Sequence, residues 1–224
     1  MGESVYFRLS DLVNIVYLVS FIYSIIILKN KNIPNYIKGF YWYTIVAINI
    51  ALVHISEKYF NLIPKDFFRI LNLVSLLYHY TFLSLFISQF LILKKQRKYF
   101  KVLFIIFIIT LIAFIFTDII NHSVISFAIA NLGLIMFCIF YYNQLFKNIP
   151  ILNLLKEPSF WIITGIFFGM SITIPISLMG GYLYHNLSKN IFYSIATIMP
   201  FGYGMMHLFF IKAFLCSVQI HKGL

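Results

Sequence analysis

The sequence predicts an all-α fold, a polytopic membrane protein built as a seven-transmembrane-helix bundle. Hydrophobic residues make up 62% of the 224 residues, whereas charged residues make up only 10%. Soluble domains typically carry about 25% charged residues, so this chain lacks the charge to cover a water-facing surface. Its apolar residues also fall into long runs, most of them near the roughly 20 residues that a helix needs to cross a hydrocarbon core.

The length and pattern of these runs favour helices over the strands of a membrane barrel. Barrel strands are about ten residues long and alternate in polarity, whereas these runs are longer and apolar on every side. A helix also pairs its own backbone groups, which lipid cannot do. We expect one transmembrane domain over residues 1–224, with helices at about 12–28, 39–55, 70–93, 102–117, 124–142, 160–179 and 191–218.

The gaps between the runs hold residues that favour ends and turns. Pro34 lies with several lysines in the first gap, and Pro64 lies in the second. The third gap is the most basic segment of the chain, and we expect it to form a basic loop that contains Lys94, Lys95, Arg97, Lys98 and Lys101. The fifth gap, residues 143–159, is amphipathic enough to lie along the membrane surface.

The basic residues also predict the orientation. Twelve of the seventeen Lys and Arg residues fall in the gaps after the first, third and fifth runs and in the C-terminal tail. The positive-inside rule places these twelve in the cytoplasm, with the N-terminus out and the C-terminus in. A net charge of +11 can also indicate nucleic-acid binding, but these cations sit in short gaps between apolar runs. We therefore expect the lipid bilayer as the surroundings and no nucleic-acid partner.

Three histidines lie within the runs, where a polar side chain is costly and calls for an explanation. They are His54, His79 and His207. Counted along their helices they lie at three different depths, so they are not expected to converge on one tetrahedral metal ion. We predict no metal and no cofactor, and hydrogen bonds to neighbouring helices are the simplest role for these side chains.

His79 belongs to a polar stripe in the third run. Asn72, Ser75 and His79 share one helix face at the spacing of an amphipathic helix. This stripe either lines a ligand cavity or joins two helices, and the sequence does not decide between these roles.

The last two runs carry glycines and prolines. Gly165 and Gly169 form a small-xxx-small pair, which lets another helix approach closely. Pro175 and Pro200 predict kinks or local unwinding, and kinks in adjacent helices open space between them. We therefore predict an outward-facing cavity, and the ligand-cavity candidates are His79, Pro175, Pro200, Tyr203 and His207.

The sequence contains none of the common catalytic motifs. Paired carboxylates, a nucleophile elbow, a phosphate loop and Cys-His metal spacing are all absent. We therefore predict no catalytic residues and no enzyme activity.

The second half of the chain carries three distinctive features: LLKEPSFWIITGIFFG (Leu154 to Gly169), Pro175 and GMMHLFFIKAFLC (Gly204 to Cys216). In these residues it resembles a large family of small bacterial membrane proteins that have no assigned activity. Genes of this family often lie near those of sensor histidine kinases. The resemblance implies the bacterial cytoplasmic (inner) membrane, a sensory or accessory role, and a cytoplasmic signalling partner such as a histidine kinase.

Two functions remain open from the sequence. The first is a seven-helix sensory or transducing component that binds a small or lipidic ligand. The alternative is a small transporter or channel subunit, for which His79, Tyr203 and His207 would provide a polar path. A lipid-modifying membrane enzyme is the least favoured interpretation.

Overall fold

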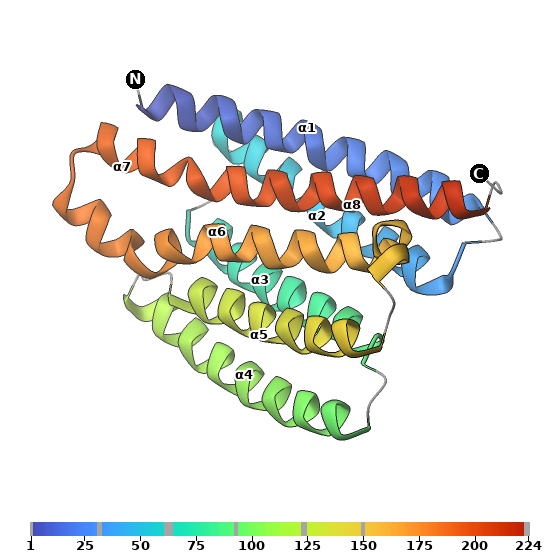
Figure 1. Cartoon of the computed structure of the whole chain (residues 1–224). Helices are drawn as coiled ribbons and strands as arrows, with labels where there is room; N and C mark the ends of the chain where they lie inside the picture. The colour runs from blue at the N-terminus through green and yellow to red at the C-terminus, as the bar shows by residue number, and fades with distance from the viewer. Residues whose placement is uncertain are drawn as a thin grey trace.

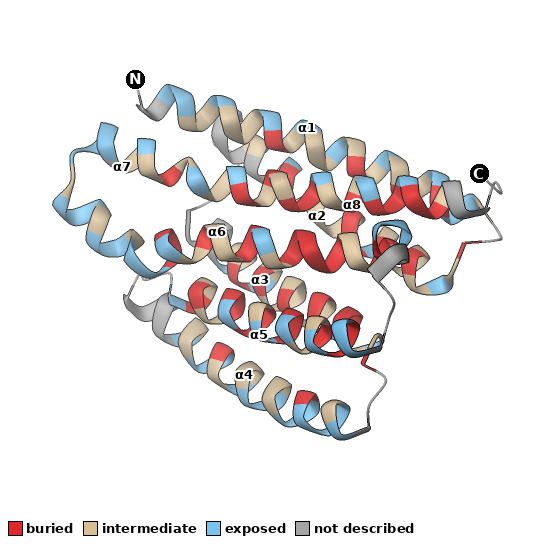
Figure 2. Cartoon of the chain, viewed as in Figure 1, coloured by how far each residue is buried: buried red, intermediate tan, exposed pale blue. Residues whose placement is uncertain are grey.

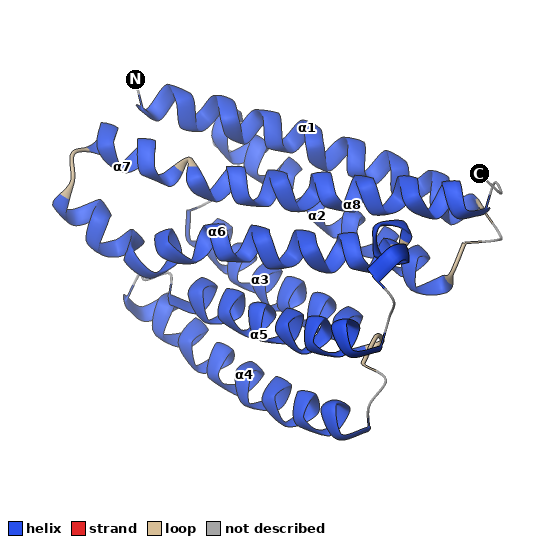
Figure 3. Cartoon of the chain, in the orientation of Figure 1, coloured by secondary structure: helices blue, strands red, loops and turns tan. Residues whose placement is uncertain are grey.

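The computed structural model describes residues 2–30, 33–60, 65–91, 94–121, 125–148 and 151–221. Figure 3 shows that helices make up nearly all of this part of the chain and that it contains no strand. The helices are α1 (Gly2–Lys29), α2 (Asn35–Phe60), α3 (Lys65–Ser88), α4 (Lys94–Asn121), α5 (Ile125–Asn148), the 3-10 helix η1 (Ile151–Lys156), α6 (Pro158–Asn186), α7 (Lys189–Ala196) and α8 (Ile198–His221).

The predicted all-α fold is therefore confirmed at this level. Seven helical segments of the described chain are long and apolar enough to cross a membrane, with α7 and α8 together forming the seventh. Most of the helices extend beyond the apolar runs that predicted them, because a helix does not have to stop where hydrophobic residues stop.

The basic segment shows this difference best. The sequence predicted a gap from residue 94 to residue 101, but these residues form about the first two turns of α4. Lysine, arginine and glutamine are good helix formers, so the segment continues the apolar helix that follows it. The prediction of a loop was wrong.

The predicted seventh helix is divided at Thr197 into α7 and α8. Pro200 lies one turn further on, and its ring excludes a normal hydrogen bond to the carbonyl of Ala196. The N–H of Phe201 already donates to the carbonyl of Thr197 at 3.2 Å, so the helix resumes immediately. By contrast, α6 stays helical through Pro175.

The helices run up and down, so that the gaps richest in basic residues meet at one end of the bundle (Figure 1). We call this end, where α1 and α8 finish and α4 begins, the basic end. Neighbouring contacts connect α1, α2, α3, α5, α6 and α8 into a closed ring, and α4 packs outside it against α3 and α5.

Aromatic side chains fill the half of the bundle nearer the basic end. Phe40 is fully buried, and its ring centroid lies 4.5 Å from that of Phe86 and 5.0 Å from that of Phe210. Large apolar side chains also cover the outside of the bundle, and α4 in particular shows little buried surface (Figure 2). On α4, Ile109 is 62% exposed and Phe116 is 63% exposed. An apolar exterior of this kind is what a bilayer accepts.

The glycine pair of α6 lies directly against α8. A Cβ atom on Gly165 would lie 2.7 Å from Cβ of Phe209, and one on Gly169 would lie 2.9 Å from Cβ of Met206. Gly202 of α8 faces back in the same way, since its added Cβ would lie 3.0 Å from the carbonyl oxygen of Gly169. Small residues on both helices therefore allow the backbones to approach closely.

Candidate functional site

A cavity of about 300 Å³ lies between α1, α2, α3 and α8, in the half of the bundle away from the basic end. Phe127, near the start of α5, completes its wall. The polar residues that line it are Tyr6, Ser10, Asn14, Tyr17, Tyr43, Asn72, Ser75, His79, Tyr203 and His207. The apolar lining includes Val13, Ala47, Ala51, Leu76, Pro200 and Met206.

Tyr43 of α2 contacts both histidines that line the cavity. Its hydroxyl lies 2.8 Å from Nδ1 of His79, and its ring centroid lies 6.1 Å from that of His207. Tyr17 of α1 also contacts His207, with 4.1 Å between the ring centroids. Four helices therefore each contribute one ring to this cluster, which we call the histidine floor: Tyr17, Tyr43, His79 and His207.

Two nitrogen atoms of the histidine floor lack hydrogen-bond partners. His207 is 1% exposed, and its Nδ1 has no partner. Nε2 of His79 is also buried without one. If Nδ1 of His79 accepts the proton of the Tyr43 hydroxyl, Nε2 carries the ring proton and is a donor. A buried polar group without a partner costs about 1–3 kcal/mol, so these two nitrogens are polar atoms beside the cavity that the described residues leave unsatisfied.

The walls of the cavity are polar stripes at helical spacing. Asn72, Ser75 and His79 of α3 all line it, and the bond from His79 to Tyr43 also joins α3 to α2. The stripe therefore joins two helices and also lines a cavity, and its role in binding a ligand stays a prediction. A second stripe on α1, formed by Tyr6, Ser10, Asn14 and Tyr17, was missed. It has the same spacing, but the prediction began this helix at Leu12 and so left out half of the stripe.

The structure brings together four of the five ligand-cavity candidates. His79, Pro200, Tyr203 and His207 line the cavity. Among the described residues α6 contributes none to the lining, and Pro175 is exposed on that helix. Pro175 therefore does not border this cavity, since it lies on an exposed part of α6.

His79 and His207 lie closer together than their depths along the chain suggested. Both imidazole rings lie against Tyr43, with ring-centroid distances of 5.2 Å for His79 and 6.1 Å for His207. The side chain of His54 lies outside the described residues. In the described part of the chain, no group of three or more His, Cys, Asp or Glu side chains is placed to hold a metal ion.

The chemistry of the lining describes the ligand that would fit. None of the described lining residues is Asp, Glu, Lys or Arg, so the cavity supplies no full carboxylate, ammonium or guanidinium charge. It supplies aromatic rings, hydroxyls, amides and two imidazoles. A volume of about 300 Å³ is at the small end of ligand pockets. This lining offers apolar contact and neutral hydrogen-bonding groups, and no full charge from the described residues.

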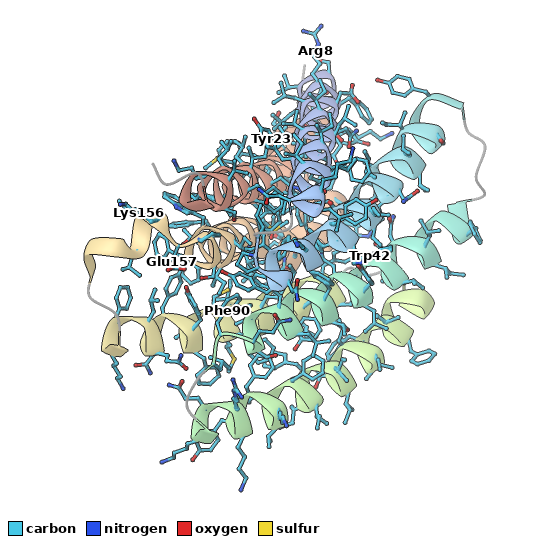
Figure 4. All side chains as sticks on the ribbon, turned by 90° about the vertical axis from the view of Figure 1, so that its right-hand side faces the viewer. Arg8, Tyr23, Trp42, Phe90, Lys156 and Glu157 are labelled. Carbon is cyan, nitrogen blue, oxygen red and sulfur yellow. The ribbon has the colours of Figure 1, made fainter. Side chains whose placement is uncertain are left out.

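The basic segment lies at the other end of the molecule from this cavity. Lys95, Arg97, Lys98 and Lys101 are exposed there, and Nε of Arg97 donates to the carbonyl of Leu91. The side chain of Lys94 lies outside the described residues. Figure 4 views the molecule from this end and shows Lys156 and Glu157 on the segment that enters α6.

Comparison of the chain with protein-family models, curated proteins and solved structures found no match. The resemblance of the second half to small bacterial membrane proteins therefore stays a prediction. The candidate site rests on its geometry.

Proposed function

We propose that this chain is a multi-pass protein of the bacterial cytoplasmic membrane that senses a small uncharged ligand. The ligand would bind in the cavity from the outer side, and its binding would be transmitted through α8 to the cytoplasmic side. One observation carries the proposal. His207 is buried on α8, lines the cavity, and has a ring nitrogen without a partner.

The positive-inside rule supports the orientation. The gaps with most of the Lys and Arg residues meet at the basic end, and the cavity lies in the opposite half of the bundle. With the basic end in the cytoplasm, the cavity belongs to the outer half of the membrane.

Helix α8 offers a physical route between the two ends. It is continuous from Ile198 to His221, and Tyr203 and His207 contact the cavity. Further along, Nζ of Lys212 lies 5.7 Å from the centroid of the Trp161 ring, whose Nε1 donates to the carbonyl of Leu155 at 2.8 Å. A ligand that binds one position of α8 more tightly than another would shift the population of these contacts.

The first experiment tests the ligand. The protein is purified in detergent, and its thermal unfolding is followed with a panel of small uncharged aromatic compounds that carry amide or carbonyl groups. We expect at least one compound to raise the Tm of the wild type, because ligand binding to the folded state stabilises it. The shift should disappear in His207→Leu and persist in Phe168→Leu, a change on the exposed face of α6. An unchanged wild-type Tm across the panel would contradict the proposal.

The second experiment tests transmission. Crosslinking in native membranes, followed by capture through a C-terminal tag, should recover a cytoplasmic signalling partner such as a histidine kinase. Replacing the exposed Lys95 and Lys98 by glutamine should lower this recovery, because the partner would meet the basic surface. Recovery that is unchanged after neutralisation of the whole basic segment would rule out the transducing role.

A transporter or channel subunit is the second candidate. The polar lining that extends from Tyr6 to His207 favours it as half of a path. The aromatic core around Phe40 and Phe210 argues against an open path through the other half. Uptake into proteoliposomes of a compound that raises the Tm, abolished in His79→Leu and His207→Leu, would favour transport over sensing.

A further inference from the structure

A second cavity of about 580 Å³ lies between the end of α3 and the start of α4, at the basic end. It is separate from the histidine floor and shares no lining residue with it. Its described lining consists of Leu85, Ser88, Gln89, Arg97, Phe100, Lys101, Phe104 and Ile105. We call it the α3–α4 cleft.

The cleft opens on the outside of the bundle. Leu85 is 49% exposed and Ile105 is 55% exposed, although both line the cleft. Helix α4 packs outside the ring of the other helices, so the cleft lies between it and the body of the protein (Figure 1). In the proposed orientation, lipid of the cytoplasmic leaflet reaches this opening without crossing any protein.

The polarity of the lining changes along the cleft. Ser88, Gln89, Arg97 and Lys101 lie toward the basic end, because α3 finishes and α4 begins there. Leu85, Phe104 and Ile105 lie further from that end, where the side chains face the apolar part of the membrane. The wall is therefore cationic and polar at headgroup depth and apolar at the depth of acyl chains.

Arg97 is held in a position that suits an anion. Its Nε donates to the carbonyl of Leu91 at the end of the turn after α3. This bond uses Nε and not the terminal nitrogens of the guanidinium, which lines the cleft, and guanidinium pairs well with phosphate. No described lining residue of the cleft is an Asp or Glu that would neutralise Arg97 and Lys101.

From these observations we propose that the α3–α4 cleft binds one anionic phospholipid of the leaflet at the basic end. Arg97 and Lys101 would hold the phosphate, and one acyl chain would lie along Leu85, Phe104 and Ile105. The apolar half of the cleft favours a lipid over free phosphate, which would leave that half unused. This inference does not depend on the sensing proposal.

The test is a lipid titration by native mass spectrometry of the protein in detergent. Phosphatidylglycerol and phosphatidylcholine with the same acyl chains are the probes. We expect phosphatidylglycerol to bind at least fivefold more tightly to the wild type, since each basic residue near an anionic lipid contributes about a factor of five.

The variants compare two pairs of cations on one helix. In Arg97→Gln/Lys101→Gln the preference for phosphatidylglycerol should fall to near one. Lys95→Gln/Lys98→Gln removes the same charge from exposed positions outside the cleft and should keep most of the preference. Thermal unfolding of both variants checks that each of them is folded. An equal loss in both pairs would overturn the proposal and indicate general attraction to a basic surface.

Two further measurements separate the lipid from other anions. Ile105→Ser should weaken phosphatidylglycerol binding severalfold, because it removes an apolar contact without changing charge. Excess inorganic phosphate should leave lipid binding unchanged. Displacement by inorganic phosphate, together with no effect of Ile105→Ser, would overturn the lipid assignment and leave an anion site.

Discussion

The two halves of the bundle are built on different principles. Toward the basic end, Phe40, Phe210 and Phe214 are fully buried and pack ring against ring. Away from it, the same helices surround a cavity with a polar lining. Tyr43 lies at the boundary, since its ring packs on Phe40 at 5.3 Å and its hydroxyl meets His79. Aromatic rings therefore fill one half of the bundle, whereas the other half encloses a cavity.

The largest loss of stability is expected from a change in the aromatic half of the bundle, near the basic end. Phe40→Ala removes a ring that contacts five other aromatic rings, and it should destabilise the protein by about 4 kcal/mol. Phe168→Ala, on a ring that is 48% exposed, is the matched control and should cost much less. Reversible unfolding in mixed micelles measures both. Similar costs for the two variants would show that the aromatic core does not carry the stability.

A smaller loss of stability is expected when the close contact between α6 and α8 is disturbed. Gly169→Ala places a methyl group 2.9 Å from Cβ of Met206 and 3.1 Å from the carbonyl oxygen of Gly202. Crowding of this kind should cost about 2 kcal/mol. Gly181→Ala meets nothing within 4 Å and should stabilise α6 by up to about 1 kcal/mol, because alanine favours helix over glycine. Unfolding of the two variants under the same conditions should therefore give opposite signs.

The smallest change in stability is expected in the half of the bundle that surrounds the cavity. His207→Leu removes a buried ring nitrogen that has no partner, so the unfolding free energy should change by less than about 1 kcal/mol. The same change should abolish binding of any compound that stabilises the wild type. A loss as large as that of Phe40→Ala would mean that His207 is a structural residue, and the division between the halves would fail.

Particular residues show how far the sequence reached into the site. Tyr203 and His207 were found because prolines and glycines marked the last helix as irregular. Tyr43 was missed, since one more tyrosine in a chain with 20% aromatic residues carries no distinctive signal. Tyr6 and Ser10 were missed because hydrophobicity alone began the first helix too late.

The predictions for Pro175 and for the basic segment differ from the structure for a related reason. Proline reduces hydrogen bonding within its own helix, but which neighbour fills the adjoining space depends on packing. The basic residues from Lys94 onward were assigned to a loop because they are charged, although charge does not end a helix. A hydropathy pattern indicates whether a segment lies in lipid or in water. It says less about whether the backbone of that segment is helical.

The sequence by itself determined the helical class, the seven apolar segments, the close approach allowed by Gly165 and Gly169, and the bias of charge to one end. These properties follow from composition and from spacing along one chain. Only the tertiary structure decided that Tyr17, Tyr43, His79 and His207 meet, that Pro175 stays apart, and that a cleft separates α3 from α4. Contacts between helices depend on their relative rotation and offset, and no local pattern in one helix specifies either.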